Sequence, residues 1–205
     1  MNWIDLFPTS ILTDTPKDIT FDDIALYKKT ILEEPIILNT NKDNFKSSLN
    51  QKILDNVIFS KISKNIINLS KKYLNEIGHN FEDTQISNSW SIIFQKGNTS
   101  ELHQHKNSYI SGVYYLTSGS EITFKNPHIN SYFFYPECKD VPTTPSNFRS
   151  HSIFRINPKP NFLILFPSFL EHIVEIHDKN EDRIGIAFNI IPKGEFGGLS
   201  SKLYL

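Results

Sequence analysis

The sequence predicts a mainly β protein in which short antiparallel strands form a sandwich or barrel and the helices lie in the N-terminal part. Two observations carry this prediction. After residue 80 the chain is a series of short apolar segments separated by turn residues, without helical periodicity between them, which is typical of antiparallel sheets. In addition, 13% of the residues are aromatic, and aromatic side chains favour strands.

The expected strands follow one another at short spacing. Turn residues such as Lys96-Gly97-Asn98 and Thr117-Ser118-Gly119-Ser120 separate them. The predicted strands are Thr84–Gln95, Tyr109–Leu116, Glu121–Lys125, Tyr132–Tyr135, His151–Ile156, Phe162–Phe166 and Arg183–Ile191. The stretch Pro136–Ser150 is rich in Pro, Thr and Ser and is predicted to be a long loop that could close over a site.

The first 80 residues alternate extended and helical patterns. Trp3–Leu12 is predicted to be an edge strand interrupted at Pro8. A weak helical pattern covers Phe21–Leu32 and ends before Pro35. The clearest helix is Val57–Ile77, because its apolar residues recur at steps of three and four and therefore share one face.

Composition narrows the class of protein. Lys and Arg together number 21 and Asp and Glu 22, so the net charge of −1 gives no electrostatic footprint for nucleic acid or an anionic membrane. The single cysteine, Cys138, excludes a disulfide framework or a Cys-based metal site. The first residues lack the features of a signal peptide, so we expect a cytoplasmic protein. We expect one domain over 1–205, with a strand and supporting helices in 1–80 and a β core in 84–191.

Three histidines give the first indication of chemistry. His103 and His105 are two positions apart, and on an extended segment such residues point to the same side. His172 follows a predicted strand and a proline turn. Imidazole suits divalent iron, zinc, copper and nickel, and such a pair with a distant His is how double-stranded β-helix metalloenzymes hold their metal. Taken alone, the pair could also be a chance feature of a surface or core.

Arg183 opens an otherwise apolar strand eleven positions after His172. A buried guanidinium needs an anionic partner, because an unpaired buried charge is costly. A ligand carboxylate bound by both arms of the guanidinium is one such partner. The alternative is a strand-end arginine that pairs with Glu181 or Asp182 or is solvated.

Taken in chain order, these motifs resemble a branch of the iron(II)- and 2-oxoglutarate-dependent oxygenase superfamily. The resemblance is dense from residue 86 to 191 and thinner before that. The segments that carry it are Leu6–Thr9, Ser89–Ile92, His103–His105, Ser111–Leu116, Ile122–Pro127, Phe166–His172 and Arg183–Asn189. It implies a double-stranded β-helix, the jelly-roll or cupin-like fold, over residues 84–191 with the N-terminal helices packed outside.

The resemblance also implies a function. Fe(II) would be held by His103, His105 and His172, and no catalytic residue beyond these ligands is expected. 2-Oxoglutarate would be the cosubstrate, with its distal carboxylate on Arg183, and molecular oxygen the second substrate. The reaction would be hydroxylation of an amino acid, a peptide or a small metabolite, without nucleic-acid or membrane partners.

Two positions depart from the superfamily pattern. His105 stands where the pattern has Asp or Glu, so either three histidines hold the metal or an acid such as Glu101 completes the site. Gly185 stands where a hydroxyl residue is common. A second hydrogen bond to the cosubstrate carboxylate must then come from elsewhere, and the residues proposed for it are Tyr109, Ser111 and Tyr115.

Two other functions remain open. A three-histidine cupin-type dioxygenase that does not use 2-oxoglutarate would need no cation at the depth of Arg183. A non-catalytic jelly-roll binding module would bind no metal tightly.

Overall fold

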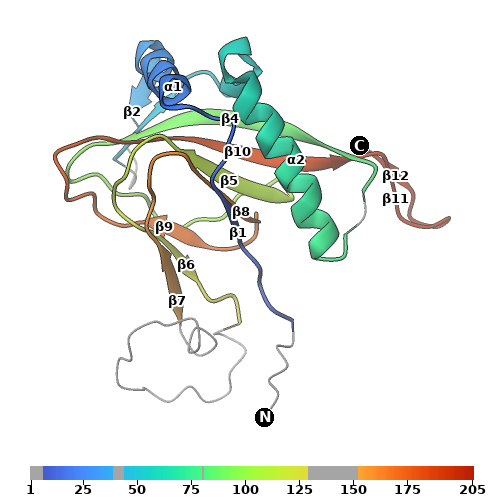
Figure 1. The fold of residues 1–205 in the computed structure, drawn as a ribbon. Coiled ribbons are helices and arrows are strands. Elements are labelled where there is room, and N and C mark those ends of the chain that lie inside the picture. The colour runs from blue at the N-terminus through green and yellow to red at the C-terminus, as the bar shows by residue number, and fades with distance from the viewer. Residues whose placement is uncertain (1–6, 39–43, 80, 129–151) are drawn as a thin grey trace.

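The computed structural model describes residues 7–38, 44–79, 81–128 and 152–205, and every statement below concerns these residues (Figure 1). Within them, two antiparallel sheets face each other, and two helices cover the outer face of the larger sheet (Figure 1). No helix in these ranges is long and apolar enough to span a membrane.

The larger sheet contains seven of the described strands. In spatial order they are β1 (Leu12–Asp14), β8 (Phe162–Pro167), β5 (Ile110–Tyr115), β10 (Arg183–Lys193), β4 (Asp83–Phe94), β3 (Lys46–Ser48) and β2 (Ile36–Leu38). The second sheet contains β7 (Ile153–Ile156), β6 (Ile122–Lys125) and β9 (His172–Val174). A hairpin of β11 (Glu195–Phe196) and β12 (Leu203–Tyr204) follows.

The chain passes back and forth between the two sheets. After β5 in the large sheet come β6 and β7 in the small one, then β8, β9 and β10 in alternation. This winding is the double-stranded β-helix, and it confirms the predicted fold class. The residues 12–14, 36–38 and 46–48 add three short strands to the large sheet, so the N-terminal part contributes to the sheet as well as to the helices that cover it.

The large sheet has an apolar core on each face. The outer core lies against the helices and includes Ile66 and Tyr114, and the inner core between the sheets includes Phe94 and Phe166. Because the central strands are buried on both faces, they appear in the sequence as continuous apolar runs rather than as alternating patterns. Phe162–Pro167 is such a run.

The helices begin at recognisable signals. Helix α1 (Phe21–Glu33) starts at a capping box between Thr20 and Asp23. Helix α2 (Ser60–Glu76) is preceded by two short 3-10 turns, Ile53–Asp55 and Val57–Phe59. The prediction of a helix over residues 57–77 is therefore confirmed except for its first turn, and the buried residues of α2 lie on the predicted apolar face.

Some sequence-based expectations differ from the structure. Of the strand predicted over Trp3–Leu12, residues 3–6 lie outside the described residues and residues 7–11 are not in a strand; the first described strand covers Leu12–Asp14. The expected strand at Tyr132–Tyr135 and the expected loop at Pro136–Ser150 lie outside the described residues. Strands β2, β3 and β9 were not predicted, because three residues are too few to establish a period.

Candidate metal centre and cosubstrate site

The structure brings His103, His105 and His172 together. One ligand nitrogen from each ring lies within 4.8 Å of the others. The ring centroids are 4.3 Å apart for His103 and His172, 5.2 Å for His105 and His172, and 5.3 Å for the remaining pair. Three neutral imidazoles in this arrangement fit a divalent cation of the borderline class to which iron belongs.

Backbone hydrogen bonds explain why these rings meet. His103 and His172 exchange both of their backbone hydrogen bonds, at 3.0 and 2.9 Å, in an isolated antiparallel bridge. The amide of His105 donates to the carbonyl of Ser168 at 3.0 Å. Residues 101–107 therefore form a loop fixed at two points. The prediction that the pair shares a strand face is wrong, although the rings still converge.

The second ring nitrogen of two of these histidines is already engaged. His103 Nδ1 lies 2.8 Å from the carbonyl oxygen of Glu101, and His172 Nδ1 lies 3.0 Å from that of Leu170. A carbonyl oxygen can only accept, so each Nδ1 carries the proton and each Nε2 keeps its lone pair. Such outer contacts fix the tautomer and the orientation of metal-binding imidazoles.

Burial keeps two of the imidazoles neutral. Desolvation, followed by the neighbouring His103, lowers the pKa of His105 to about 4 and that of His172 to about 3. Since only a neutral imidazole can bind a metal, both rings are in the binding form at neutral pH.

Glu101 contacts the histidine cluster through its backbone carbonyl. Its carbonyl accepts from His103, and its carboxylate is not among the ligand atoms of the described cluster. The arrangement therefore favours three histidines over the carboxylate alternative.

Arg183 lies on the inner face of the large sheet and is completely buried. Its Nε donates to the carbonyl of Ser120 at 3.2 Å and its Nη2 to the hydroxyl of Tyr115 at 3.4 Å. The guanidinium carbon stands 5.0 Å from the ring centres of both Phe94 and Tyr115. Within the part of the chain that the structure describes, its Nη1 has no hydrogen-bond partner, and an unused buried donor of this kind fits an anionic ligand.

The pairing of Arg183 with acids at the start of its strand is not observed. Among the described residues, no ion pair includes this guanidinium: Glu181 accepts from His177 through its backbone carbonyl, and Asp182 accepts from Thr117 in the same way. Desolvation lowers the pKa of Arg183, and the contact with Tyr115 opposes that shift. An arginine stays protonated in proteins, so the buried guanidinium is a positive charge without an acidic partner among the described residues.

The surroundings of Arg183 include two residues that the sequence did not reveal. A Cβ on Gly119 would lie 2.5 to 2.7 Å from the Cγ, Cβ and Cδ of Arg183, so only glycine leaves room for this side chain. His177 is completely buried; its Nε2 contacts the Glu181 carbonyl at 2.7 Å and its Nδ1 lies 3.4 Å from Ser120. Gly119 was visible only as a turn residue, and no spacing links His177 to the site.

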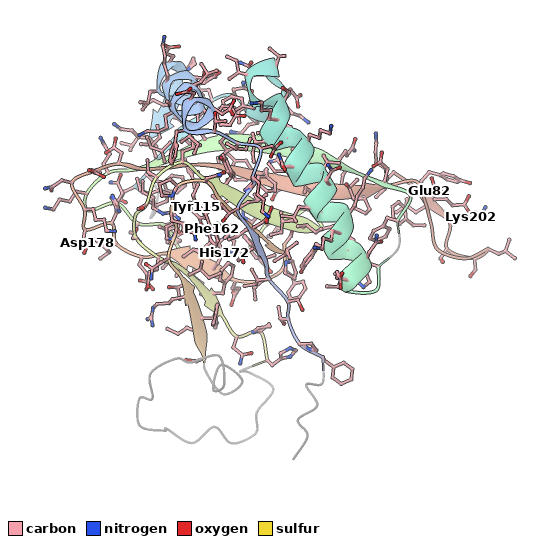
Figure 2. The ribbon with its side chains drawn as sticks, viewed as in Figure 1. Glu82, Tyr115, Phe162, His172, Asp178 and Lys202 are labelled. Carbon is pink, nitrogen blue, oxygen red and sulfur yellow. The ribbon has the colours of Figure 1, made fainter. Side chains whose placement is uncertain are left out.

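The three residues proposed for the second carboxylate contact lie in different places. Tyr115 is beside Arg183, and its ring centre lies 6.3 Å from that of Phe162 (both Tyr115 and Phe162 are labelled in Figure 2). Ser111 is four residues before Tyr115 in β5, and its hydroxyl bonds to Asn189 and Ser168. Tyr109 bonds to His79, and both line an open pocket that also includes His105, at the opposite end of β5 from Arg183. Only Tyr115 is therefore placed to assist Arg183.

Comparisons with known proteins agree with this geometry. Residues 88–189 match the model of the family described as "Putative 2OG-Fe(II) oxygenase". The chain belongs to the 2OG-Fe(II) oxygenases. Fe(II) and 2-oxoglutarate are thus the cofactor and cosubstrate that membership of this family assigns to the chain. A search of curated protein sequences finds no match.

Solved structures share the fold at low sequence identity. HygX from Streptomyces hygroscopicus, with nickel and 2-oxoglutarate bound, is 12% identical and has a TM-score of 0.60, over 90% of this chain and 83% of its own. A prolyl-4-hydroxylase from Pseudomonas putida is 11% identical, with a TM-score of 0.62 over 91% and 94%. SnoN, an epimerase from nogalamycin biosynthesis, is 8% identical, with a TM-score of 0.64 over 90% and 79%.

Proposed function

We propose that this 2OG-Fe(II) oxygenase hydroxylates a C–H bond of a small molecule or a peptide, with His103, His105 and His172 as the iron ligands and Arg183 as the anchor for 2-oxoglutarate. The observation that carries the proposal is the free Nη1 of a completely buried guanidinium on the inner face of the large sheet. A buried cation with an unused donor fits the distal carboxylate of a dianionic cosubstrate.

The residues fit the groups that the family uses. When bound, Fe(II) and 2-oxoglutarate supply the oxidising chemistry: O₂ converts 2-oxoglutarate to succinate and CO₂, and the second oxygen atom enters the substrate C–H bond as a hydroxyl. The three imidazoles supply neutral nitrogen ligands, with the Nδ1 protons of His103 and His172 held by backbone carbonyls. A dianionic chelator complements the charge of this ligand set better than a neutral one would.

The protein also orients the cosubstrate and excludes water. The Tyr115 hydroxyl lies beside Arg183 and can donate a second hydrogen bond to the same carboxylate, in place of the hydroxyl that Gly185 lacks. Apolar side chains, including Phe94, Phe166 and Ile164, form the inner core around this face. A charge-assisted pair in such surroundings is worth about 1.5–3 kcal/mol.

The substrate class follows from the family only in outline. One related structure is a prolyl-4-hydroxylase, and another structure of HygX contains hygromycin B. Peptides and small metabolites are therefore both within the range of this fold. The three-histidine ligand set is the one feature that favours a cupin-type dioxygenase without 2-oxoglutarate, but such an enzyme has no use for Arg183.

The test is a titration of 2-oxoglutarate into the anaerobic Fe(II) protein, followed by the metal-to-ligand charge-transfer absorbance. Replacing Arg183 with Met should leave iron binding intact and weaken 2-oxoglutarate by about ten- to hundredfold, the equivalent of 1.5–3 kcal/mol. Arg183→Lys should recover part of this loss, as a point charge without the planar fork.

A matched control is Arg155→Met, because Arg155 is half exposed and lies near the acids Glu121 and Glu175. It should bind 2-oxoglutarate like the wild type. An unchanged titration curve for Arg183→Met would remove Arg183 from the site. Failure of the wild type to bind millimolar 2-oxoglutarate would favour the cosubstrate-independent dioxygenase.

A further inference from the structure

Two asparagines lie opposite each other on the inner face of the large sheet. In the antiparallel register of β4 and β10, Asn88 faces Asn189, and Trp90 faces Ala187 one step nearer to Arg183. Directly opposed residues of an antiparallel pair project from the same face with Cβ atoms about 5 Å apart. Asn189 lies six residues beyond Arg183 on β10, so the asparagine pair and the arginine occupy opposite ends of one face.

The asparagine pair lies at the end where the histidines are. The ring of Trp90 is 5.8 Å from the ring of His105. On the other side, Asn189 accepts a hydrogen bond from Ser111, whose hydroxyl lies 2.8 Å from that of Ser168. The backbone carbonyl of Ser168 accepts from His105. Asn189 is thus connected to the metal-binding loop through two serines.

In both asparagine side chains the amide oxygen accepts a hydrogen bond and the NH₂ group donates none to a described residue. Asn189 Oδ1 accepts from the Ser111 hydroxyl at 2.7 Å, and Asn88 Oδ1 accepts from the Ser87 hydroxyl at 3.2 Å. Within the described part of the chain, neither Nδ2 group has a hydrogen bond. Asn189 is only 5% exposed. Its Nδ2 is nevertheless not among the fully buried side-chain atoms without a partner, so this donor is reached by water, which a ligand carbonyl could replace.

An irregularity in the strand pairing supports this arrangement. The register between β4 and β10 shifts after Asn189, which leaves Ser87 opposite no residue of β10. The Ser87 hydroxyl lies within hydrogen-bond distance of both Asn88 Oδ1 and the Asn189 carbonyl. Bulges next to active sites re-aim side chains, and here the bulged serine fixes the orientation of one of the two amides.

The chemistry of this end differs from that of the cosubstrate end. Arg183 supplies a full positive charge where a carboxylate is expected, whereas Asn88, Asn189 and Ser111 are all uncharged. Two neutral N–H donors suit an uncharged carbonyl oxygen, and the half-buried Trp90 beside them offers an apolar surface. We infer that Asn88 and Asn189 recognise a neutral carbonyl of the substrate, as in a carboxamide or a peptide bond. This inference rests on the proposed function.

The test uses two probes that differ in one group, propionamide and propionate, of which only the first contains a neutral carbonyl. Each is titrated into the protein loaded with Zn(II), in place of Fe(II), and 2-oxoglutarate, and the side-chain NH₂ resonances of ¹⁵N-labelled protein are followed. The amide probe should shift the resonances of Asn88 and Asn189 and bind at least about tenfold more tightly than the carboxylate probe. Asn88→Asp and Asn189→Asp should each weaken the amide probe by about two- to tenfold, the worth of one hydrogen bond.

Asn75→Asp is the matched control, because Asn75 is an exposed residue of α2 and should leave both affinities unchanged. If the buried substitution at position 189 prevents folding, the half-buried position 88 still decides. Equal affinity for the two probes, unchanged affinity in Asn88→Asp, or no binding of either probe to the 2-oxoglutarate-loaded protein would overturn this inference and leave the proposed function intact. Failure to bind 2-oxoglutarate itself, measured beforehand, would overturn both.

Discussion

Arg183 depends on a glycine for its position. Its side chain passes so close to Gly119 that a methyl group there would overlap three of its carbons. We expect Gly119→Ala to displace the guanidinium and to weaken 2-oxoglutarate on the order of tenfold, through loss of part of a charge-assisted pair, while iron binding persists. The anaerobic charge-transfer titration measures both. Gly198→Ala is the control, since no atom lies within 4 Å of a Cβ built there.

Loss of any one of the three imidazoles should weaken metal binding, whereas loss of a histidine elsewhere should not. Removing one of three ligands should weaken a divalent metal by about 100-fold or more, because each ligand supplies a few kcal/mol of the binding free energy. Competition with a chelating dye measures the affinity of Co(II) for His105→Ala and His172→Ala. His128→Ala, at an exposed position, should bind like the wild type. Wild-type affinity in His105→Ala would mean that an acid is the third ligand.

The sequence predicted those single residues whose chemistry requires a particular partner. A pair of histidines, a distant histidine and an arginine in an apolar strand each imply a partner, and the structure places all four on or beside the inner face. Residues that act through shape or backbone, such as Gly119 and Ser87, have no such signature. Tyr109 was proposed together with Ser111 and Tyr115, but its hydroxyl contacts His79 and it lies at the opposite end of β5 from Arg183.

At the scale of elements, the capping box of α1 makes a prediction for acid conditions. The backbone of Thr20, then the ammonium of Lys61, lower the pKa of Asp23 to about 2 from 3.8. Because the folded-state pKa lies below the unfolded one, the stabilisation is complete above about pH 4 and is lost as the pH falls toward 2. Asp23→Asn should cost about 0.3–1.5 kcal/mol at neutral pH and show a smaller loss of stability below pH 4.

Urea unfolding at several pH values measures both effects. Asp22→Asn serves as the control, because Asp22 lies in the same first turn without taking part in the capping box. If the two variants lose the same free energy at neutral pH, the capping contacts of Asp23 contribute nothing beyond its charge near the helix terminus.

The elements that the sequence predicted are those with a long or unambiguous pattern. The α2 stripe and the apolar runs of β5, β8 and β10 are buried on the faces that their residues imply. The three-residue strands β1 and β3 pair with strands far away in the sequence, and β2 pairs with β3. Such short strands are held by backbone hydrogen bonds, which no local pattern of side chains predicts. The alternation between two sheets followed from the resemblance to the family rather than from any local pattern.

At the scale of the whole molecule, the metal centre lies where the loop containing His103 and His105 meets the two sheets. The loop containing His103 and His105 is bonded to β9 and to the end of β8 through backbone contacts. Metal bound by both imidazoles of this loop and by His172 would connect the small sheet to that loop. The binding of metal should therefore raise the melting temperature, by an amount that grows with the metal concentration above its dissociation constant.

Acid should destabilise the metal-free protein through the same histidines. The pKa of His105 falls to about 4 and that of His172 to about 3, against 6.5 for an exposed imidazole. Between these values the unfolded chain binds protons that the folded chain does not, so the free energy of unfolding decreases as the pH falls from about 6.5 toward 3. The limit is about 1.4 kcal/mol per pH unit for each group. Urea titrations of the metal-free protein from pH 7 to 4 measure the slope, which should be shallower in the double variant His105→Gln/His172→Gln. Equal slopes for the two proteins would show that these imidazoles are protonated in the folded state and hence poor metal ligands at mildly acidic pH.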